Sequence, residues 1–304
     1  MSLKSKTKLA GLLLATLLAS PVRADSLDST PRTAIMTAFA PEKAAMMALL
    51  KDRKTYRLQG SEITLGSLEG HPVLLTESGV SMVNAAMTAQ RLIDRFKIAR
   101  IVFSGIAGGI DPSLHVGDVV VPEDWAEPLE DVVMRETPDG PKAPAWMADE
   151  VISSIPPFGV LASKKVDTST GFHQSFKADP ALLATARKLA SGLTLKACSS
   201  DGRCLDQPPR ILVGGMGVST MSFVDNAKFR DWLYDAWKAR ATDMESGAVA
   251  QVADVNGVPF IAFRSLSDLA GGEADANRMD LFMTLAAENA AAVVKAFVAE
   301  LPKS

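Results

Sequence analysis

The chain has 304 residues, of which 47% are hydrophobic and 22% are charged, and its formal net charge is −3. This is the composition of an ordinary globular protein, with enough chain to bury a large core. The mildly acidic balance gives no basic surface for nucleic acid or an anionic membrane, and aromatic residues make up only 6% of the chain. We therefore expect no nucleic-acid partner.

The first 24 residues have the three parts of a secretory signal. Three lysines come first, an apolar run of 11 residues follows, and small residues end the stretch with Val22 and Ala24 in the positions that precede a cleavage site. The alternative is an N-terminal membrane anchor, but 11 apolar residues are too few to cross a bilayer. We predict cleavage after Ala24, a mature domain at 25–304, and a periplasmic or secreted protein.

No segment after this leader approaches the roughly 20 apolar residues that a membrane-spanning helix needs, so we expect no contact with a membrane after cleavage. The only cysteines, Cys198 and Cys204, lie in a polar stretch rich in turn residues. In an exported protein, two cysteines this close together indicate a disulfide across a short surface loop. The alternative is a pair of free thiols, and the absence of a nearby histidine argues against a metal site.

Between residue 32 and the C-terminus, apolar runs alternate with amphipathic stretches, and periodicity and stop signals indicate the type of each element. The alternation predicts one α/β domain on a largely parallel or mixed sheet, without internal repeats. In chain order we expect a strand at 32–40, a helix at 42–52, two strands around a glycine turn at 61–79, a helix at 81–97, a strand at 99–109 running into a glycine loop, a strand at 115–124, irregular chain at 126–165, a helix at 179–191, a strand and glycine-rich turn at 210–223, helices at 226–238 and 246–256, a strand at 260–268 and a helix at 280–300.

Two acidic residues are expected at one edge of this sheet. Glu245 lies where a strand passes into helix 246–256, and Asp268 ends the next strand. A strand–helix–strand crossover makes the two strands parallel, so both carboxylates would emerge at the carboxyl edge, where open α/β folds bind ligands. The glycine-containing segments 104–109 and 214–220 follow apolar strands and would open there too.

Each of these residues also has a simpler interpretation. Glu245 fits an acid placed at a helix N-terminus by the helix dipole, and Asp268 fits a loop cap. Arg264 fits either a structural ion pair or a group of the site. The prediction of a site therefore depends on their convergence at one edge. Asp243 has no partner that the sequence identifies, and we assign it no role.

Three segments carry a resemblance to a known family. SGIAGGIDPSLHVGDVVVP (104–122), TDMESGAVAQV (242–252) and VPFIAFRSLSDLAGG (258–272) resemble the purine nucleoside phosphorylase/methylthioadenosine nucleosidase superfamily, and look closest to its nucleosidase branch. The chain is also similar to plant vegetative and bark storage proteins of this superfamily. The resemblance implies a single-domain, three-layer fold with a central mixed β-sheet flanked by helices. It further implies a purine nucleoside as small-molecule partner, no cofactor or metal, and a homodimer or larger homo-oligomer.

The resemblance assigns catalytic roles to two residues. Asp268 would protonate or hydrogen-bond purine N7, and Glu42 would activate the attacking water. Cleavage of an N-glycosidic bond leaves negative charge on the purine, and a general acid that neutralises it contributes about 10²–10⁴-fold to the rate. To act near neutral pH, Asp268 needs a pKa raised by burial or by a nearby carboxylate.

The remaining residues implied by the resemblance would bind the nucleoside. Glu245 would bind the ribose 2′- and 3′-hydroxyls, with Met244 packed against the sugar. Phe223 would stack on the base, and Val224 would give it backbone hydrogen bonds. The other expected contacts are Arg264 near the water and ribose, Ser267 beside the acid, Ala107 and Gly108 beneath the nucleoside, and Ser78, Gly79 and Val80 on the opposite wall.

The nucleophile distinguishes the candidate activities. Phosphorylases of this superfamily carry arginines that bind phosphate, one after the first strand and one before the glycine turn. Here the first strand ends in TAFAPEKA, and Phe103 or Ser104 occupies the second position. A phosphate dianion without guanidinium partners is poorly bound, which favours water.

Two further activities stay open. A non-catalytic nucleoside-binding or storage-like protein is favoured by the resemblance to the plant proteins. It is also favoured by Ile106, which stands where nucleosidases often have a serine hydroxyl. A phosphorylase is the third candidate. Pro41 stiffens the loop before Glu42, and the segment 214–220 departs from the usual nucleosidase loop, so the base and the 5′ substituent stay open.

Overall fold

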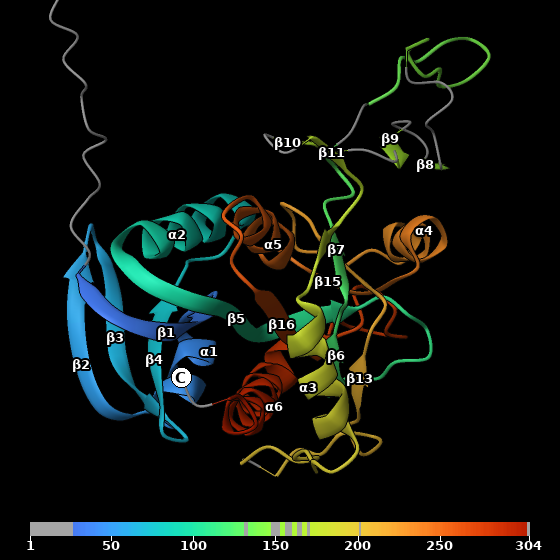
Figure 1. Ribbon diagram of the computed structural model, residues 1–304. Coiled ribbons are helices and arrows are strands. Elements are labelled where there is room, and N and C mark those ends of the chain that lie inside the picture. Colours follow the sequence, from blue (N-terminus) through green and yellow to red (C-terminus); the bar gives the residue numbers. More distant parts are fainter. Residues whose placement is uncertain are drawn as a thin grey trace, which may run out of the picture.

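The computed structural model describes residues 27–130, 133–146, 153–155, 160–162, 166–168, 171–200 and 202–302, so the predicted leader lies outside the described residues. A mixed sheet forms the centre of the molecule and helices cover both of its faces (Figure 1). The predicted fold class, an α/β mixed sheet flanked by helices, is confirmed.

The helices agree closely with the sequence prediction. They are α1 (Ala40–Met47), α2 (Met82–Arg95), α3 (Pro180–Ala190), α4 (Ala227–Trp237), α5 (Ser246–Val255) and α6 (Met279–Ala299). The strands are β1 (Asp28–Thr37), β2 (Lys51–Leu58), β3 (Ser61–Leu68), β4 (His71–Glu77), β5 (Phe96–Gly109), β6 (Val119–Val121), β7 (Asp124–Ala126), β8 (Ser153–Ile155), β9 (Val160–Ala162), β10 (Val166–Thr168), β11 (Gly171–His173), β12 (Phe176–Lys177), β13 (Ile211–Val213), β14 (Met216–Ser219), β15 (Ala239–Asp243) and β16 (Phe260–Asp268).

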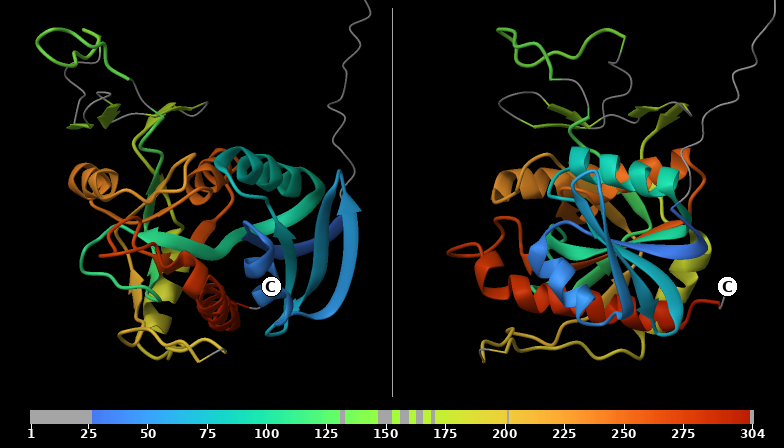
Figure 2. Two further views of the ribbon diagram at one scale, coloured as in Figure 1. Left: turned by 180° about the vertical axis from the view of Figure 1, so that it is seen from behind. Right: turned by 90° about the vertical axis from the view of Figure 1, so that its left-hand side faces the viewer.

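The main sheet runs in the order β12-β7-β14-β15-β5-β1-β4-β3-β2, with β16 paired to β5 and β6, and β13 paired to β6. Alternate residues of β1 reach opposite faces of the sheet. Ile35 packs with α1, α3 and α6 in one hydrophobic cluster, whereas Ala34 and Met36 pack with α2 and α5 in another. Two buried layers of side chains therefore separate the sheet from its helices, as Figure 2 shows from two further directions.

The expected direction of two strands was wrong. β16 is parallel to β5 over residues 260–268, but β15 is antiparallel to it, with Ala241 opposite Gly109 and Thr242 opposite Gly108. The crossover rule applies to consecutive strands that lie in one parallel arrangement. It does not apply here because β15 and β16 lie on opposite edges of β5, where both pair with Gly108. The expected glycine loop at 104–109 is also strand, as the last part of β5.

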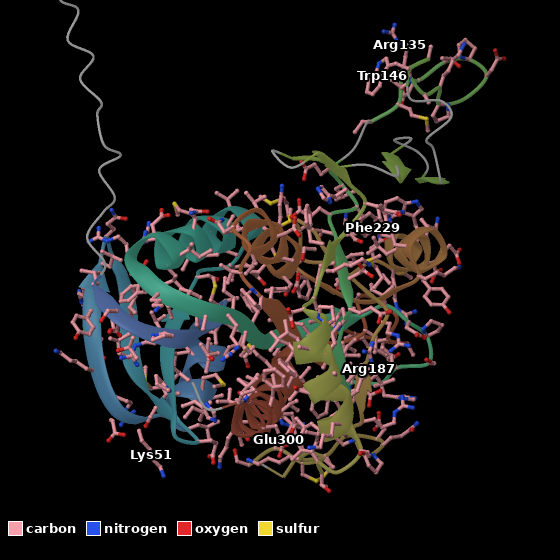
Figure 3. The ribbon with its side chains drawn as sticks, viewed as in Figure 1. Lys51, Arg135, Trp146, Arg187, Phe229 and Glu300 are labelled. Carbon is pink, nitrogen blue, oxygen red and sulfur yellow. A yellow bond between two sulfur atoms is a disulfide. The ribbon has the colours of Figure 1, made fainter. Side chains whose placement is uncertain are left out.

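β2 was not predicted from the sequence. The predicted helix at 42–52 ends at Met47, and the charged stretch that follows forms an edge strand paired only with β3 among the described strands. Its residues are mostly exposed, and Figure 3 shows Lys51 pointing outward. Charged side chains on an edge strand oppose pairing with other chains. For that reason β2 lacks the apolar alternation by which strands are recognised.

The segment predicted as one strand at 115–124 divides into β6 and β7. The chain at 126–165 was expected to be irregular, and its described parts contain only an isolated bridge between Arg135 and Lys142 and the short strands β8 and β9, with β10 and β11 following. In Figure 2 these short strands lie apart from the main sheet.

One helix in the described part of the chain is long and apolar enough to cross a membrane. It is α6, with 21 residues and a mean hydropathy of 1.5 over its most apolar window, so the expectation that no later segment would approach that length was wrong. Within the fold, 61% of that window is buried, and Val293, Val294 and Phe297 belong to the core beneath the sheet. α6 is therefore the central helix of one face.

The predicted disulfide between Cys198 and Cys204 is confirmed, with a Cα–Cα distance of 4.0 Å. It closes a short loop whose next residue, Leu205, packs against a cluster formed by Val116, Phe282 and Leu285. The loop is thereby attached to the start of α6.

Candidate active site

A pocket opens where β1 and β15 approach each other along one edge of β5. β1 pairs with β5 up to Phe103, and β15 pairs with it at Gly108 and Gly109. Gly108 pairs with Asp268 on its other edge, so β1 and β15 share the same edge of β5 and run toward each other. Residues 104–107 have no strand partner on that edge among the described strands. The carboxylate of Glu42, from the first turn of α1, reaches this gap at Ile106.

The pocket collects ten of the predicted site residues: Glu42, Val80, Ala107, Gly108, Phe223, Val224, Met244, Glu245, Ser267 and Asp268. Three predicted residues are not among those that line it. Arg264 lies behind the lining, and Ser78 and Gly79 form the turn that precedes Val80. The lining residues that the sequence analysis did not assign to the site are Ala38, Phe39, Ile106, Ser222, Thr242, Asp243 and Met279.

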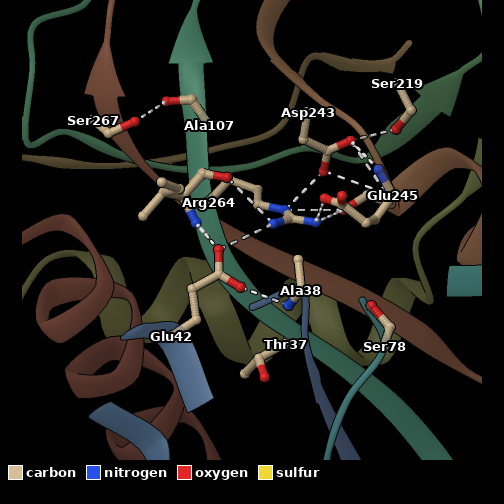
Figure 4. Close-up of polar contacts among 12 residues, drawn as sticks. Thr37, Ala38, Glu42, Ser78, Ala107, Ser219, Asp243, Glu245, Arg264 and Ser267 are labelled. Atoms are coloured by element: carbon tan, nitrogen blue, oxygen red, sulfur yellow. Dashed lines mark hydrogen bonds and ion pairs between the residues drawn. The ribbon is translucent and has the colours of Figure 1, made fainter. Parts of the chain in front are cut away.

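Arg264 is fully buried and is surrounded by three carboxylates (Figure 4). Its Nε lies 2.7 Å from Asp243 Oδ2, its Nη2 lies 3.5 Å from Glu245 Oε2, and its Nη1 lies 3.9 Å from Glu42 Oε1. Its guanidinium carbon also lies 4.3 Å from the centre of the Phe103 ring. An unpaired cation buried this deeply would be very costly, and the three acids offset that cost.

Asp243, which was left without a role, is a central member of this group. Besides Arg264, its carboxylate accepts hydrogen bonds from the Ser219 hydroxyl and from the backbone N–H groups of Glu245 and Ser246. Bonds from an Asp to the N–H groups two and three residues later are a common way to begin a helix. The sequence contained this signal, because helix 246–256 was predicted to begin just after Asp243.

Glu42 lies in the first turn of α1 and is 2% exposed. Its Oε2 accepts the N–H of Ala38 at 2.6 Å, and its Oε1 accepts the N–H of Ile106 at 2.8 Å, in the unpaired gap of β5. Burial raises the pKa of Glu42 to about 7, although Arg264 acts in the opposite direction. A carboxylate with this pKa is suited to take a proton near neutral pH.

Glu245 precedes α5 and is 4% exposed. Its Oε1 accepts the N–H of Ser81 at 3.0 Å. That N–H is presented by the turn before α2, where Gly79 and Ser81 both have positive φ angles, of 82° and 103°. Burial raises the pKa of Glu245 to about 6, with Arg264 lowering it and Asp243 raising it further. Gly79 thus contributes by shaping the turn.

Asp268 ends β16 and is 1% exposed. Its Oδ1 accepts the N–H of Ala270 at 2.9 Å, and its Oδ2 accepts the Ser267 hydroxyl at 2.8 Å. Burial raises the pKa of Asp268 above its usual value, and these hydrogen bonds oppose the rise. No cation is found among its hydrogen-bond and ion-pair partners in the described part of the chain.

The arrangement has two chemically different ends joined by apolar walls. At one end, carboxylates around a buried guanidinium can accept hydrogen bonds from hydroxyl groups and a proton from water. At the other, a buried carboxyl held by neutral donors can deliver a proton. Phe223, which is 52% exposed, lies at the mouth, and Val224 is buried beside it. No cluster of three or more His, Cys, Asp or Glu suited to a metal occurs in the described ranges.

Comparison with known proteins identifies the family of this chain. Residues 32–299 match the family model described as the phosphorylase superfamily. A 5′-methylthioadenosine/S-adenosylhomocysteine nucleosidase of Bacillus thuringiensis is 31% identical over 261 residues, which cover 84% of this chain and 93% of that protein.

Solved structures share the fold. A mutant of the Helicobacter pylori 5′-methylthioadenosine nucleosidase, with 5′-methylthioadenosine in its active site, has a TM-score of 0.68 at 22% identity, covering 90% of this chain and 100% of that one. The Helicobacter pylori futalosine hydrolase has a TM-score of 0.66 at 22% identity, covering 89% and 98%. With its mixed sheet, its converging acids and a family match over nearly all of its described length, the chain belongs to the phosphorylase superfamily.

Proposed function

We propose that this protein hydrolyses the N-glycosidic bond of a purine nucleoside, releasing the free base and the sugar. The observation that carries the proposal is that Glu42, Glu245 and Asp268, which are far apart in the sequence, line one pocket. The nucleosidases among its relatives support the same reaction class.

The geometry suggests a separate role for each of the three acids. Glu245, held by the N–H of Ser81 and by Arg264, is fixed as an acceptor for the ribose diol. Glu42, with a pKa of about 7, takes a proton from the attacking water as it bonds to the sugar carbon. Asp268 gives its proton to the purine as the bond to the sugar breaks. Each step moves one proton, so the base leaves neutral and the sugar gains a hydroxyl.

Water is better supported than phosphate as the nucleophile. None of the described residues that line the pocket is a lysine or an arginine. Arg264 is the basic residue nearest to the acids, and its guanidinium is already engaged by Asp243, Glu245 and Ser246. A phosphate dianion placed here would meet three carboxylates and no free cation.

The substrate class that we favour is an adenine nucleoside with an apolar 5′ substituent, such as the 5′-methylthioadenosine found in a related structure. Phe39, Val80 and Met279 give the pocket an apolar lining beyond its acids. The fold itself does not select this group, since the futalosine hydrolase is similar to almost the same degree.

We further propose that the protein is exported and forms a homodimer or larger homo-oligomer. Export is supported by the signal-like leader and fits a disulfide between Cys198 and Cys204. It can be tested by N-terminal sequencing of the protein recovered outside the cytoplasm, which should begin at Asp25. Sedimentation tests the assembly, and a monomer at micromolar concentration would contradict it.

A non-catalytic nucleoside-binding protein is the second candidate. It is favoured by Ile106, whose side chain lines the pocket beside Glu42 and offers no hydroxyl to a bound water. Under this alternative, the pocket would bind a nucleoside without cleaving it.

One experiment separates these functions. Purified protein is incubated with a panel of purine nucleosides, with and without phosphate, and the free base is measured. We expect base release without phosphate, and a Glu42→Gln variant that binds nucleoside but releases base at least about 10²-fold more slowly. A strict requirement for phosphate would contradict hydrolysis. Binding without release in the unmodified protein would favour the second candidate.

A further inference from the structure

The loop between β16 and α6 places Asn277 between two acids. Its Nδ2 lies 3.3 Å from Asp268 Oδ1 and 3.2 Å from Asp225 Oδ1, and its own Oδ1 accepts the N–H of Met279 at 2.9 Å. A backbone N–H can only donate, so the amide oxygen of Asn277 must face Met279. The amide NH₂ group therefore faces both carboxylates.

This orientation fixes where Asp268 carries a proton. Its Oδ1 accepts from Ala270 N–H and from the Asn277 NH₂ group, and neither of these groups can accept a hydrogen bond in return. Among the described residues its Oδ2 meets only the Ser267 hydroxyl, which lies 2.8 Å away and can reorient toward the Ala107 carbonyl oxygen at 3.4 Å. A proton on the carboxyl therefore belongs on Oδ2.

Asn277 also links the acid to the pocket mouth. Asp225 directly follows Phe223 and Val224, which line the pocket. The amide group of Asn277 thus joins the segment 223–225, at the mouth of the pocket, to the buried carboxyl of Asp268. Asn277 was not predicted from the sequence, because it lies beyond the end of the recognised motif at 258–272.

We propose that Asn277 is a positioning residue: it holds Asp268 with its proton on Oδ2 and joins it, through Asp225, to the segment that contacts the base. This inference rests on the proposed function, in which Asp268 donates the proton to the leaving purine. Because Asn277 donates to the carboxylate, it also stabilises the product of that proton transfer.

Several charged groups surround this acid. Glu273, in the same loop, accepts the N–H of Leu269 and raises the pKa of Asp268. Arg278 is paired with Asp206, and Arg230 of α4 donates to the Gly109 carbonyl. Asp225, Asp275 and Asp280 are further acidic residues in the segments next to Asp268. Ala270, Ser267 and Asn277 are the neutral donors that act against burial.

Two variants test the role of the amide. Asn277→Ala removes one donor from the carboxylate, so the pKa of Asp268 should rise by roughly half to one unit. Asn277→Asp keeps the shape and can still accept the N–H of Met279, but it places a third carboxylate beside Asp225 and Asp268. We expect the pKa to rise by more than about one unit. Asn256→Ala, on the far end of α5, is the matched control and should leave the pKa of Asp268 unchanged.

The pKa is measured directly by ¹³C NMR titration of the carboxyl carbons, with the Asp268 signal identified by its loss in Asp268→Asn. The alkaline limb of kcat/KM should move in the same direction and in the same order. If both variants titrate as the unmodified protein does, the proposal is wrong, and a shift as large in Asn256→Ala would also contradict it. The NMR result does not depend on turnover. Failure of the proposed function would instead appear as absence of base release from the unmodified protein.

Discussion

The two ends of the pocket hold their carboxyl groups by different means. Around Arg264, Glu42, Asp243 and Glu245 share one buried guanidinium. At the other end, Asp268 is held by Ser267, by a backbone N–H and by Asn277, all of them neutral. Both ends are buried, and burial raises the pKa at each, so the difference lies in the partners.

The two ends therefore act on the pKa values of their acids through different partners. A neighbouring guanidinium favours the ionised form and so opposes burial at Glu42 and Glu245. At Asp268 only hydrogen bonds oppose burial, and burial still raises the pKa of this carboxyl above its usual value. A base at one end and an acid at the other are the two groups that hydrolysis of a nucleoside requires.

Removal of the buried cation, Arg264, should have the largest effect on the protein. Arg264→Met leaves three buried carboxylates without their shared cation, and loss of one member of a buried ion pair costs about 3–5 kcal/mol. We expect a Tm about 10 °C lower and no detectable base release. The control is Arg187→Met, which removes an exposed ion pair with Glu123 and should cost less than about 1 kcal/mol. Equal losses in the two variants, measured by thermal unfolding, would contradict a structural role for the buried cation.

Removing the acid should affect catalysis rather than folding. Asp268→Asn keeps the shape but has no proton of suitable pKa to give, so kcat should fall by about 10²–10⁴-fold. Nucleoside binding, measured by calorimetry, should change much less. Asp254→Asn, at an exposed position of α5, is the control and should leave kcat unchanged. A variant Asp268→Asn with nearly full kcat would show that the leaving purine needs no acid from this end.

Gly105 tests the packing at the end of the pocket that holds Arg264. A Cβ at this position would collide with Arg264 Nη1 and Glu42 Oε1. Gly105→Ala should therefore cost about 1–3 kcal/mol of stability, and displacement of these groups should lower kcat/KM by up to about 10²-fold. Gly192→Ala is the control, because nothing lies within 4 Å of its added Cβ. The idea fails if Gly105→Ala keeps full activity.

The pH dependence of kcat/KM tests the raised pKa of Glu42 without any mutation. The pKa of Glu42 is raised from 4.5 to about 7, so below pH 7 the folded protein holds it increasingly in the protonated form, which cannot accept a proton. We expect kcat/KM to fall with pH below about 7, approaching tenfold per unit. Asp268 acts in its protonated form and should not cause this loss. An acidic limb near pH 4.5 would show either that Glu42 is not the base or that its pKa is not raised.

The sequence predicted the elements better than their directions. The helices were predicted to within a few residues because their apolar stripes and stop signals are local. The direction of β15 was not predicted correctly. It depends on where along β5 this strand pairs, and the sequence does not show that pairing. β2 was missed because its exposed, charged residues resemble a loop.

In the candidate site, too, residues that belong to a local sequence pattern were predicted, and those with distant partners were not. The motif residues Glu245, Asp268 and Glu42 were recognised and do line one pocket, although the expected reason, two parallel strands, was wrong. Asp243 was recoverable from its place before a helix. The residues at 78–81 and Asn277 were not, since their roles come from a backbone N–H and an amide whose partners lie far along the chain.

The central claim, that water activated by Glu42 attacks the sugar, is tested most directly by isotope transfer. The protein is incubated with a purine nucleoside in H₂¹⁸O with phosphate present, and the sugar product is analysed by mass spectrometry. The account predicts one ¹⁸O in the free sugar, analysed before its anomeric oxygen exchanges, and a rate that falls at least about 10²-fold in Glu42→Gln. A sugar 1-phosphate as product, or unchanged ¹⁸O transfer in that variant, would contradict it.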